Sequence, residues 1–165
     1  MRLFVAICLS PSVRDALTDR ISSLRVQGTG SFTRPENLHL TLAFIGETDR
    51  LEAAEAALRR AAAGGAFSIT TGDLGCFEDL WWVGIRENTA LEQLALDVQH
   101  ALRDAEFPIE DRPWRPHITL VRRWRGPEPQ VSFTPVSMWV EKLTLMKSEQ
   151  SKGKQVYTEL CSVNL

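Results

Sequence analysis

Residues 37–46 read Asn-Leu-His-Leu-Thr-Leu-Ala-Phe-Ile-Gly, with an apolar side chain at nearly every second position. Successive side chains of a β-strand point to opposite faces, so His39 and Thr41 share one face. The other face is expected to pack into the core and carries Leu38, Leu40, Leu42 and Phe44. The stretch therefore predicts a packed strand over Leu38–Ile45 that presents an imidazole beside a hydroxyl group.

A second copy of this pattern is His117-Ile118-Thr119-Leu120, and the two copies use two of the three histidines in the chain. Leu3, which opens a predicted strand, precedes His39 by 36 residues, and Trp81 precedes His117 by the same interval. Both intervals read as strand, helix, loop and His-x-Thr strand. We therefore expect a duplicated strand–helix–strand unit whose motifs are related by a pseudo-two-fold axis.

Apolar periodicity and Gly/Pro punctuation predict the other elements. Their expected order is strand Leu3–Leu9, helix Pro11–Arg25 after the N-cap Ser10, loop Gln27–Pro35, strand Leu38–Ile45, an Ala-rich helix capped by Thr48 or Asp49 and ending near Ala63, strand Phe67–Phe77, strand Trp81–Arg86, helix Asn88–Glu106, strand His117–Trp124, loop Gly126–Pro135, and strands Val136–Lys147 and Gln155–Val163 joined by a turn at Lys152–Lys154.

Composition narrows the class of protein. A length of 165 residues fits one domain or two tightly fused lobes, and a net charge of −2 excludes a globally basic nucleic-acid binder but not a local basic cleft. The three cysteines are far apart and form no metal-binding motif, so we expect no zinc site, no disulfide framework and a cytoplasmic location. Cys8 is expected in the core. No segment is long enough to span a membrane.

Two imidazoles facing one cleft would suit acid–base chemistry on a phosphodiester without a metal. A histidine has an ordinary pKa of about 6.5, so one ring can deliver a proton while another removes one. The hydroxyls of Thr41 and Thr119 can donate hydrogen bonds to phosphate oxygens. A single His-x-Thr strand is most often structural, but two copies at matching positions favour function. His100 lies opposite the apolar stripe of its helix and is expected at the surface.

A basic segment surrounds the second motif. Residues 112–125 contain five arginines and two tryptophans and no acidic residue, a composition that can bind phosphates and stack on bases or can simply form a soluble rim. Arg122 and Arg123 alternate faces, and simple alternation places Arg123 beside His117 and Thr119 unless the strand has bulged. Both arginines are candidate phosphate ligands.

These residues together resemble the two-histidine phosphoesterase superfamily. The similarity is greatest to the bacterial RNA 2′,3′-cyclic phosphodiesterases, also called 2′-5′ RNA ligases of the LigT type, and spans essentially the whole chain. The segments that carry it are Arg2–Ile7, Asn37–Gly46, Arg115–Arg122 and Leu145–Glu149.

The resemblance implies an α+β, bilobal fold over residues 1–165, in which two intertwined lobes place antiparallel sheets along a central cleft and helices outside. It implies hydrolysis of a terminal 2′,3′-cyclic phosphate of RNA to a 2′-phosphomonoester. His39 would be the proton donor to the 3′ oxygen and His117 the proton acceptor that activates water. Thr41 and Thr119 would hold the phosphate. It implies no cofactor and no metal, and we expect a monomer.

Two alternatives stay open at this point. The same site run in reverse would seal tRNA halves through a 2′-5′ bond. A non-catalytic protein that binds RNA ends would use the arginines for affinity and the histidines only as hydrogen-bond partners, and its binding would depend strongly on salt.

Overall fold

The computed structural model describes residues 1–165 as three α-helices, one short 3-10 helix and nine strands. The elements in chain order are β1 (Arg2–Cys8), α1 (Pro11–Arg25), β2 (Thr29–Phe32), η1 (Pro35–Asn37), β3 (His39–Glu47), α2 (Leu51–Ala61), β4 (Phe67–Phe77), β5 (Leu80–Ile85), α3 (Thr89–Asp104), β6 (His117–Arg125), β7 (Ser137–Val140), β8 (Lys142–Ser151) and β9 (Lys154–Asn164).

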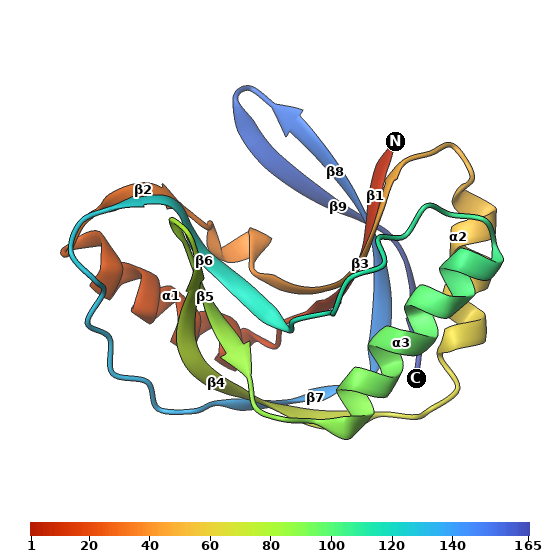
Figure 1. Ribbon diagram of the computed structural model, residues 1–165, viewed down its shortest axis with the longest axis horizontal. Coiled ribbons are helices and arrows are strands. Elements are labelled where there is room, and N and C mark those ends of the chain that lie inside the picture. The colour runs from red at the N-terminus through yellow and green to blue at the C-terminus, as the bar shows by residue number, and fades with distance from the viewer.

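The strands form two sheets, and every strand pair in them is antiparallel. One sheet has the order β3-β1-β8-β9 and the other the order β2-β6-β5-β4-β7 (Figure 1). The β8–β9 hairpin extends beyond the rest of the molecule at the top of Figure 1. The predicted α+β class with antiparallel sheets is confirmed.

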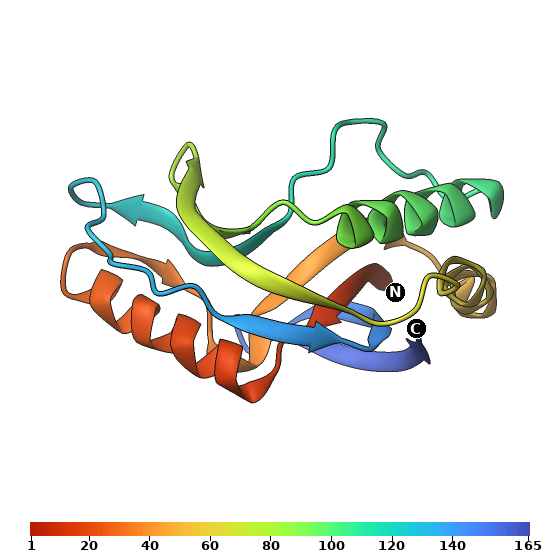
Figure 2. The ribbon, with the colours of Figure 1, turned by 90° about the horizontal axis from the view of Figure 1, so that it is seen from below.

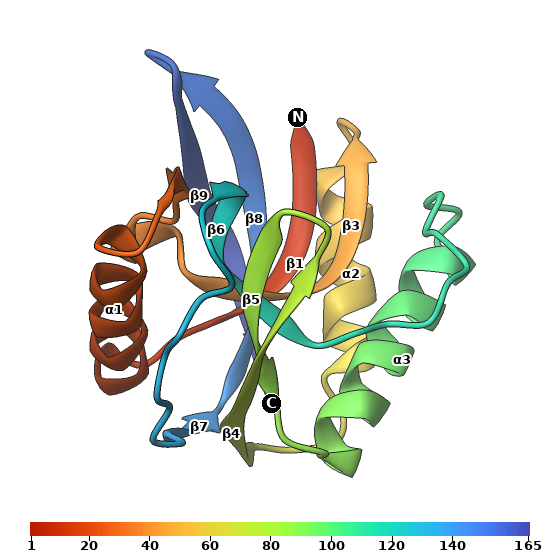
Figure 3. The same ribbon diagram turned by 60° about the vertical axis from the view of Figure 1, so that its left-hand side comes forward.

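The helices lie on the outer sides of the sheets and exchange places between the two halves of the chain. α1 follows β1 but contacts β6 of the other sheet, and α3 follows β5 but contacts α2 and β3 (Figure 3). Figure 2 shows α1 and α3 on opposite sides of the molecule with strands between them. The chain therefore crosses repeatedly between the sheets and ties them together.

Local sequence explains where α1 and α3 begin. The Ser10 hydroxyl accepts a hydrogen bond from the Val13 N–H, and Pro11 occupies the first turn, where no N–H is needed. The Asn88 side chain caps α3 through the Leu91 N–H at 2.9 Å. The buried stripes of these helices enter one cluster of 33 buried residues that includes the outer faces of both sheets. The boundaries predicted for α1 and α3 are confirmed to within two residues.

The pseudo-two-fold relation is visible in the strand pairing. His39 pairs with Cys8 of β1 and Thr41 with Ala6, while His117 pairs with Gly84 of β5 and Thr119 with Trp82. Each His-x-Thr strand thus lies beside the strand that opens its half of the chain, as the 36-residue interval predicts.

β3 bulges directly after its motif. Successive residues of β1 pair with Thr41 and Ala43, which leaves Leu42 without a partner. Leu42 and Ala43 are both buried, and Phe44 turns to the opposite face with 61% of its surface exposed. The prediction that Phe44 packs on the core face is wrong, because one extra residue reverses the alternation beyond it.

β6 bulges at the matching position. Thr119 and Val121 pair with successive residues of β5, and Leu120 has no partner on that strand. Leu120 and Val121 are both fully buried, so the next residue, Arg122, faces the same side as Thr119. Simple alternation, which selects Arg123 for that side, fails for the same reason as at Phe44.

Several other predictions are corrected. The predicted strand Val136–Lys147 is two strands, β7 and β8, which belong to different sheets and are separated at Glu141. The predicted loop Gln27–Pro35 contains β2 and the start of η1. α2 begins after Arg50, which has no side-chain cap, and Cys8 is exposed at the end of β1. The predicted turn between the last two strands is confirmed: Lys152 and Gly153, both with positive φ, form a two-residue hairpin loop.

None of the helices is both long enough and apolar enough to cross a membrane.

Candidate active site

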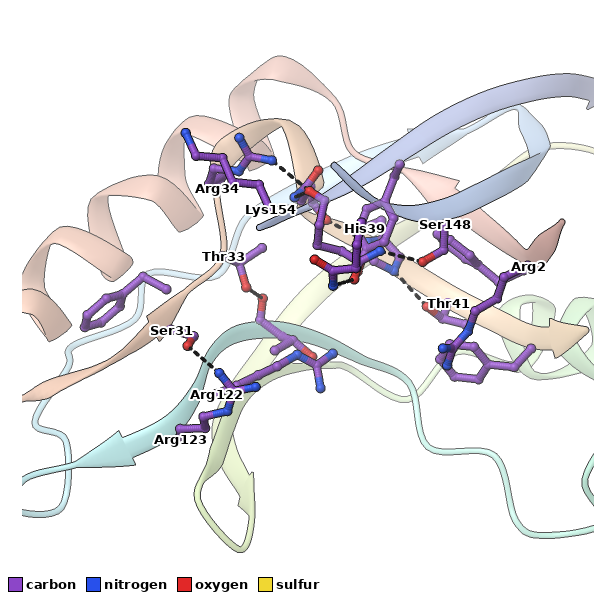
Figure 4. Close-up of a pocket in the computed structure, with 18 of the residues that line it drawn as sticks. Arg2, Ser31, Thr33, Arg34, His39, Thr41, Arg122, Arg123, Ser148 and Lys154 are labelled. Atoms are coloured by element: carbon purple, nitrogen blue, oxygen red, sulfur yellow. Dashed lines mark hydrogen bonds between the residues drawn. The ribbon is translucent and has the colours of Figure 1, made fainter. Parts of the chain in front are cut away.

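His39 and His117 line one cleft of about 680 Å³ between the two sheets. His39 enters it from β3 and His117 from β6, and these two strands contact each other. Thr41 and Thr119 line the same cleft, as do Arg122 and Arg123. Figure 4 shows His39 and Thr41 on one strand with Arg122 and Arg123 on the facing strand. All six predicted site residues therefore meet in one place.

Both imidazoles are held in the same way by the main chain. Nδ1 of His39 lies 2.6 Å from the Asn37 carbonyl oxygen, and Nδ1 of His117 lies 2.7 Å from the Arg115 carbonyl oxygen. A carbonyl oxygen can only accept, so each Nδ1 carries the hydrogen and donates it. Each neutral ring consequently has an unprotonated Nε2 that can accept a proton. The carbonyl lies two residues before the histidine in both cases, so the arrangement repeats in the two halves.

Aromatic rings fix the orientation of each imidazole. His39 lies between Phe4 and Tyr157, with ring centroids 5.0 and 5.1 Å away. His117 lies against Phe77 and Trp82, at 5.1 and 5.9 Å. These distances are typical of tilted and edge-to-face contacts.

Burial lowers the pKa of His39 below the ordinary value of 6.5, although its bond to the Asn37 carbonyl opposes the shift. The pKa of His117 is also lowered, again chiefly by burial. The Arg122 guanidinium lowers the pKa of both rings because a nearby cation disfavours a second positive charge. Burial and the Arg122 charge thus favour two neutral imidazoles, and an anion between them would favour their protonation.

The two threonines differ in their contacts. The Thr41 hydroxyl lies 2.9 Å from Nε2 of His39 and donates to it when the ring is neutral. The Thr119 carbonyl accepts a hydrogen bond from the Thr33 hydroxyl at 3.0 Å, which ties β6 to the segment before η1. Thr33 also lines the cleft, and no sequence pattern indicated it.

The two arginines also differ. Arg122, His117 and Thr119 line both this cleft and a second hollow that adjoins it. Arg123 lines the cleft only, and its guanidinium donates to the Ser31 hydroxyl at 3.3 Å. Arg123 has a φ of 55°, an uncommon value for a residue with a side chain.

Several cleft residues were missed by sequence reasoning. They come from β1, from η1 and the residue before it, and from the β8–β9 hairpin: Arg2, Phe4, Arg34, Asn37, Ser148, Gln150, Lys154, Gln155 and Tyr157. The Arg34 guanidinium and the Asn37 amide both donate to the Gln155 carbonyl, at 2.7 and 3.0 Å, and so anchor the hairpin beside the first motif. The pairing of β8 with β1 brings the hairpin there, a long-range contact that no local pattern predicts.

Other predicted residues lie outside the cleft. Trp124 is buried and its indole N–H donates to the Pro127 carbonyl, so it belongs to the core rather than to a base-stacking surface. His100 is exposed on α3, as predicted. No group of three or more His, Cys, Asp or Glu side chains is placed to hold a metal ion.

Comparison with known proteins agrees with this geometry. The sequence profile of the 2′-5′ RNA ligase superfamily matches residues 13–152. The chain belongs to this superfamily. The resemblance predicted from the motifs is thereby confirmed, and both His-x-Thr motifs lie within the matched range.

Relatives in the superfamily are similar along the chain. A protein of Escherichia coli (strain K12), named RNA 2′,3′-cyclic phosphodiesterase, is 32% identical over 96% of this chain and 93% of its own length. A relative of the same name from Geobacillus stearothermophilus is 33% identical over 76% of this chain, which spans only 43% of that protein. The crystal structure of E. coli LigT in apo form superposes with a TM-score of 0.82 at 29% identity, covering 99% of this chain and 96% of that chain.

Proposed function

We propose that this protein is an RNA 2′,3′-cyclic phosphodiesterase that hydrolyses a terminal cyclic phosphate to a 2′-phosphomonoester. The observation that carries the proposal is the convergence of His39 and His117 in one cleft, each with Nδ1 fixed by a main-chain carbonyl. The names of the relatives support the substrate class. An acid and a base on opposite walls are the groups that this reaction needs.

In the proposed mechanism His117 is neutral and His39 is protonated when the substrate is bound. Nε2 of His117 accepts a proton from water as the water oxygen attacks phosphorus. The bond from phosphorus to the 3′ oxygen breaks, and His39 donates its Nε2 proton to that oxygen. The phosphate anion offsets the effect of burial on the pKa of His39 by favouring the imidazolium.

We assign the phosphate contacts to Thr41, Thr119, Arg122 and Arg123. The hydroxyls of Thr41 and Thr119 would donate to the non-bridging oxygens without adding charge. The charge of Arg122 lowers the pKa of both histidines, so we assign its guanidinium to stabilising the negative charge that develops on the phosphate between them. Arg123 would contact the phosphate or its neighbour from the Ser31 side of the cleft.

The rest of the cleft suits an RNA strand. Arg2, Arg34 and Lys154 line it together with polar side chains of the β8–β9 hairpin. Cations along a groove bind successive phosphates and make the affinity dependent on salt. We therefore place the nucleotides upstream of the cyclic phosphate along this hairpin.

The test is hydrolysis of an oligonucleotide with a 2′,3′-cyclic phosphate end, measured for the wild type and for His39→Ala and His117→Ala. Each substitution should lower kcat by about 10²–10⁴. Turnover should persist in EDTA, because the proposed acid and base are both side chains. His100→Ala is the matched control, since this exposed histidine lies on α3 outside the cleft. Tight, salt-dependent binding without turnover would instead identify a non-catalytic RNA-end binder.

Sealing of tRNA halves through a 2′-5′ bond is the second candidate, and the superfamily to which the chain belongs favours it. It uses the same site with a 5′-hydroxyl in place of water. A cytoplasmic location and a monomeric state stay predictions from the sequence.

A further inference from the structure

A second hollow of about 520 Å³ opens from the cleft beside His117, and we call it the apolar arm. Its apolar lining comes from the β3 bulge, the β4–β5 hairpin and the segment before β6, and consists of Leu42, Ala43, Phe44, Phe77, Leu80, Ile109, Pro113 and Trp114. Arg112 and Arg115 stand among these side chains. The mechanism of hydrolysis assigns nothing to this space.

The position of the apolar arm relative to the two imidazoles is informative. The two spaces have five lining residues in common, Thr41, Phe44, His117, Thr119 and Arg122. His39 lines the larger cleft but not the apolar arm. A phosphate held between the rings therefore has the larger cleft on the His39 side and the apolar arm on the His117 side. In an in-line displacement the attacking and leaving oxygens lie on opposite sides of phosphorus. With His39 as the donor to the leaving oxygen, the nucleophile arrives from the apolar arm.

Water does not need a space of this size or lining. One water molecule takes up about 30 Å³ of liquid volume, whereas ligand pockets measure about 300–1,000 Å³. Aromatic rings beside arginines are the surface on which nucleobases stack. Trp114 is fixed at the junction, because its indole N–H donates to the Thr41 carbonyl at 3.1 Å. The Arg115 guanidinium lies 5.9 Å from the centre of the Phe77 ring, in the same wall.

We propose that the apolar arm binds the nucleoside of a 5′-hydroxyl RNA end, and this inference rests on the proposed function. The bound 5′-hydroxyl takes the place of water. Nε2 of His117 accepts its proton, the 5′ oxygen bonds to phosphorus, the bond to the 3′ oxygen breaks, and His39 protonates that oxygen. The product is a 2′-5′ diester with a 3′-hydroxyl, and the two rings regain their starting protonation by exchange with solvent. The occupant of the apolar arm thus decides between hydrolysis and joining.

The experiment measures the ratio of 2′-5′-joined to hydrolysed product from one cyclic-phosphate oligonucleotide. The acceptors are a 5′-hydroxyl oligonucleotide, the same oligonucleotide with an abasic first residue, and methanol. In the wild type, the acceptor with a base should give a ratio about tenfold above the abasic one. Trp114→Ala should lower the ratio for the acceptor with a base about tenfold and leave the methanolysis-to-hydrolysis ratio within twofold.

Trp114→Phe separates stacking from support of β3, because it retains a ring but loses the bond to the Thr41 carbonyl. It should keep most of the joining. Equal joining of the abasic acceptor, or an equal fall in joining and methanolysis in Trp114→Ala, would overturn the inference. A wild type that hydrolyses but shows no base-dependent joining refutes this inference alone. A wild type that does not hydrolyse refutes the proposed function.

Discussion

Replacement of Gly75 by alanine should disturb His117 from a distance. Gly75 pairs with Trp82 across the β4–β5 hairpin, and the Trp82 ring lies 5.9 Å from His117, centre to centre. A Cβ atom at residue 75 would lie 2.3 Å from the nearest Trp82 ring atom. Carbon atoms in contact rest at about 3.5–4.0 Å, so the ring must move by roughly 1.2–1.7 Å.

The size of the effect follows from that displacement. A misplacement of about 1 Å at a reacting group can cost about 10²-fold in rate. Because the imidazole rests against the ring that moves, Gly75→Ala should lower kcat for cyclic-phosphate hydrolysis about 10–100-fold. Overpacking should also lower the free energy of unfolding by about 1–3 kcal/mol.

The assay pairs initial rates of hydrolysis with urea denaturation. Gly64→Ala is the control, because a Cβ atom there would meet nothing within 4 Å. In a Trp82→Phe background, where the clashing outer ring is gone, Gly75→Ala should lower kcat less than about threefold. If Gly75→Ala destabilised the protein and left kcat unchanged, the idea that Trp82 positions His117 would be refuted.

Three further predictions use other parts of the site and core. The pKa values of His39 and His117 are lowered from 6.5, and kcat/KM follows ionisation of the free enzyme, so kcat/KM should peak below about pH 6.5. Arg122→Gln should move this peak to higher pH, because it removes a charge that lowers both pKa values, and should raise KM. An optimum of the wild type above about pH 7 would contradict this prediction. Lys154→Ala should reduce the slope of log affinity against log salt by about 1, and an unchanged slope would remove Lys154 from the RNA contacts. Ile118→Ala should cost about 2–5 kcal/mol of unfolding free energy in urea, because Ile118 is fully buried; a cost below about 1 kcal/mol would contradict this packing.

The sequence predicted the elements whose signals are local. Ser10, Pro11 and Asn88 mark helix starts through capping, which depends on residues within one turn. The alternation around His39 and His117 placed each imidazole on the face opposite the core, because the pleat has a period of two residues. These local rules were sufficient to identify the two histidines and the two threonines as one candidate site.

The sequence failed where backbone irregularities and long-range pairing decide the outcome. The bulges at Leu42 and Leu120 could not be predicted from the sequence. A leucine followed by alanine or valine is equally typical of a regular buried strand. They turn Phe44 and Arg122, which simple alternation assigns to the core side of their strands, to the opposite side, and both side chains line the cleft. Tyr157 reaches His39 because β9 pairs with β8 and β8 with β1, which only the assembled sheet reveals.

The exchanged helices determine how the molecule should come apart. Detaching α1 exposes the outer side of β6, which carries His117, and frees the chain between β1 and β3, which carries His39. Detaching α3 uncovers β3 and loosens the connection into β6 in the same way. Neither imidazole can therefore lose its surroundings alone, so heating should give a single calorimetric transition in which amide protons beside both rings begin to exchange together.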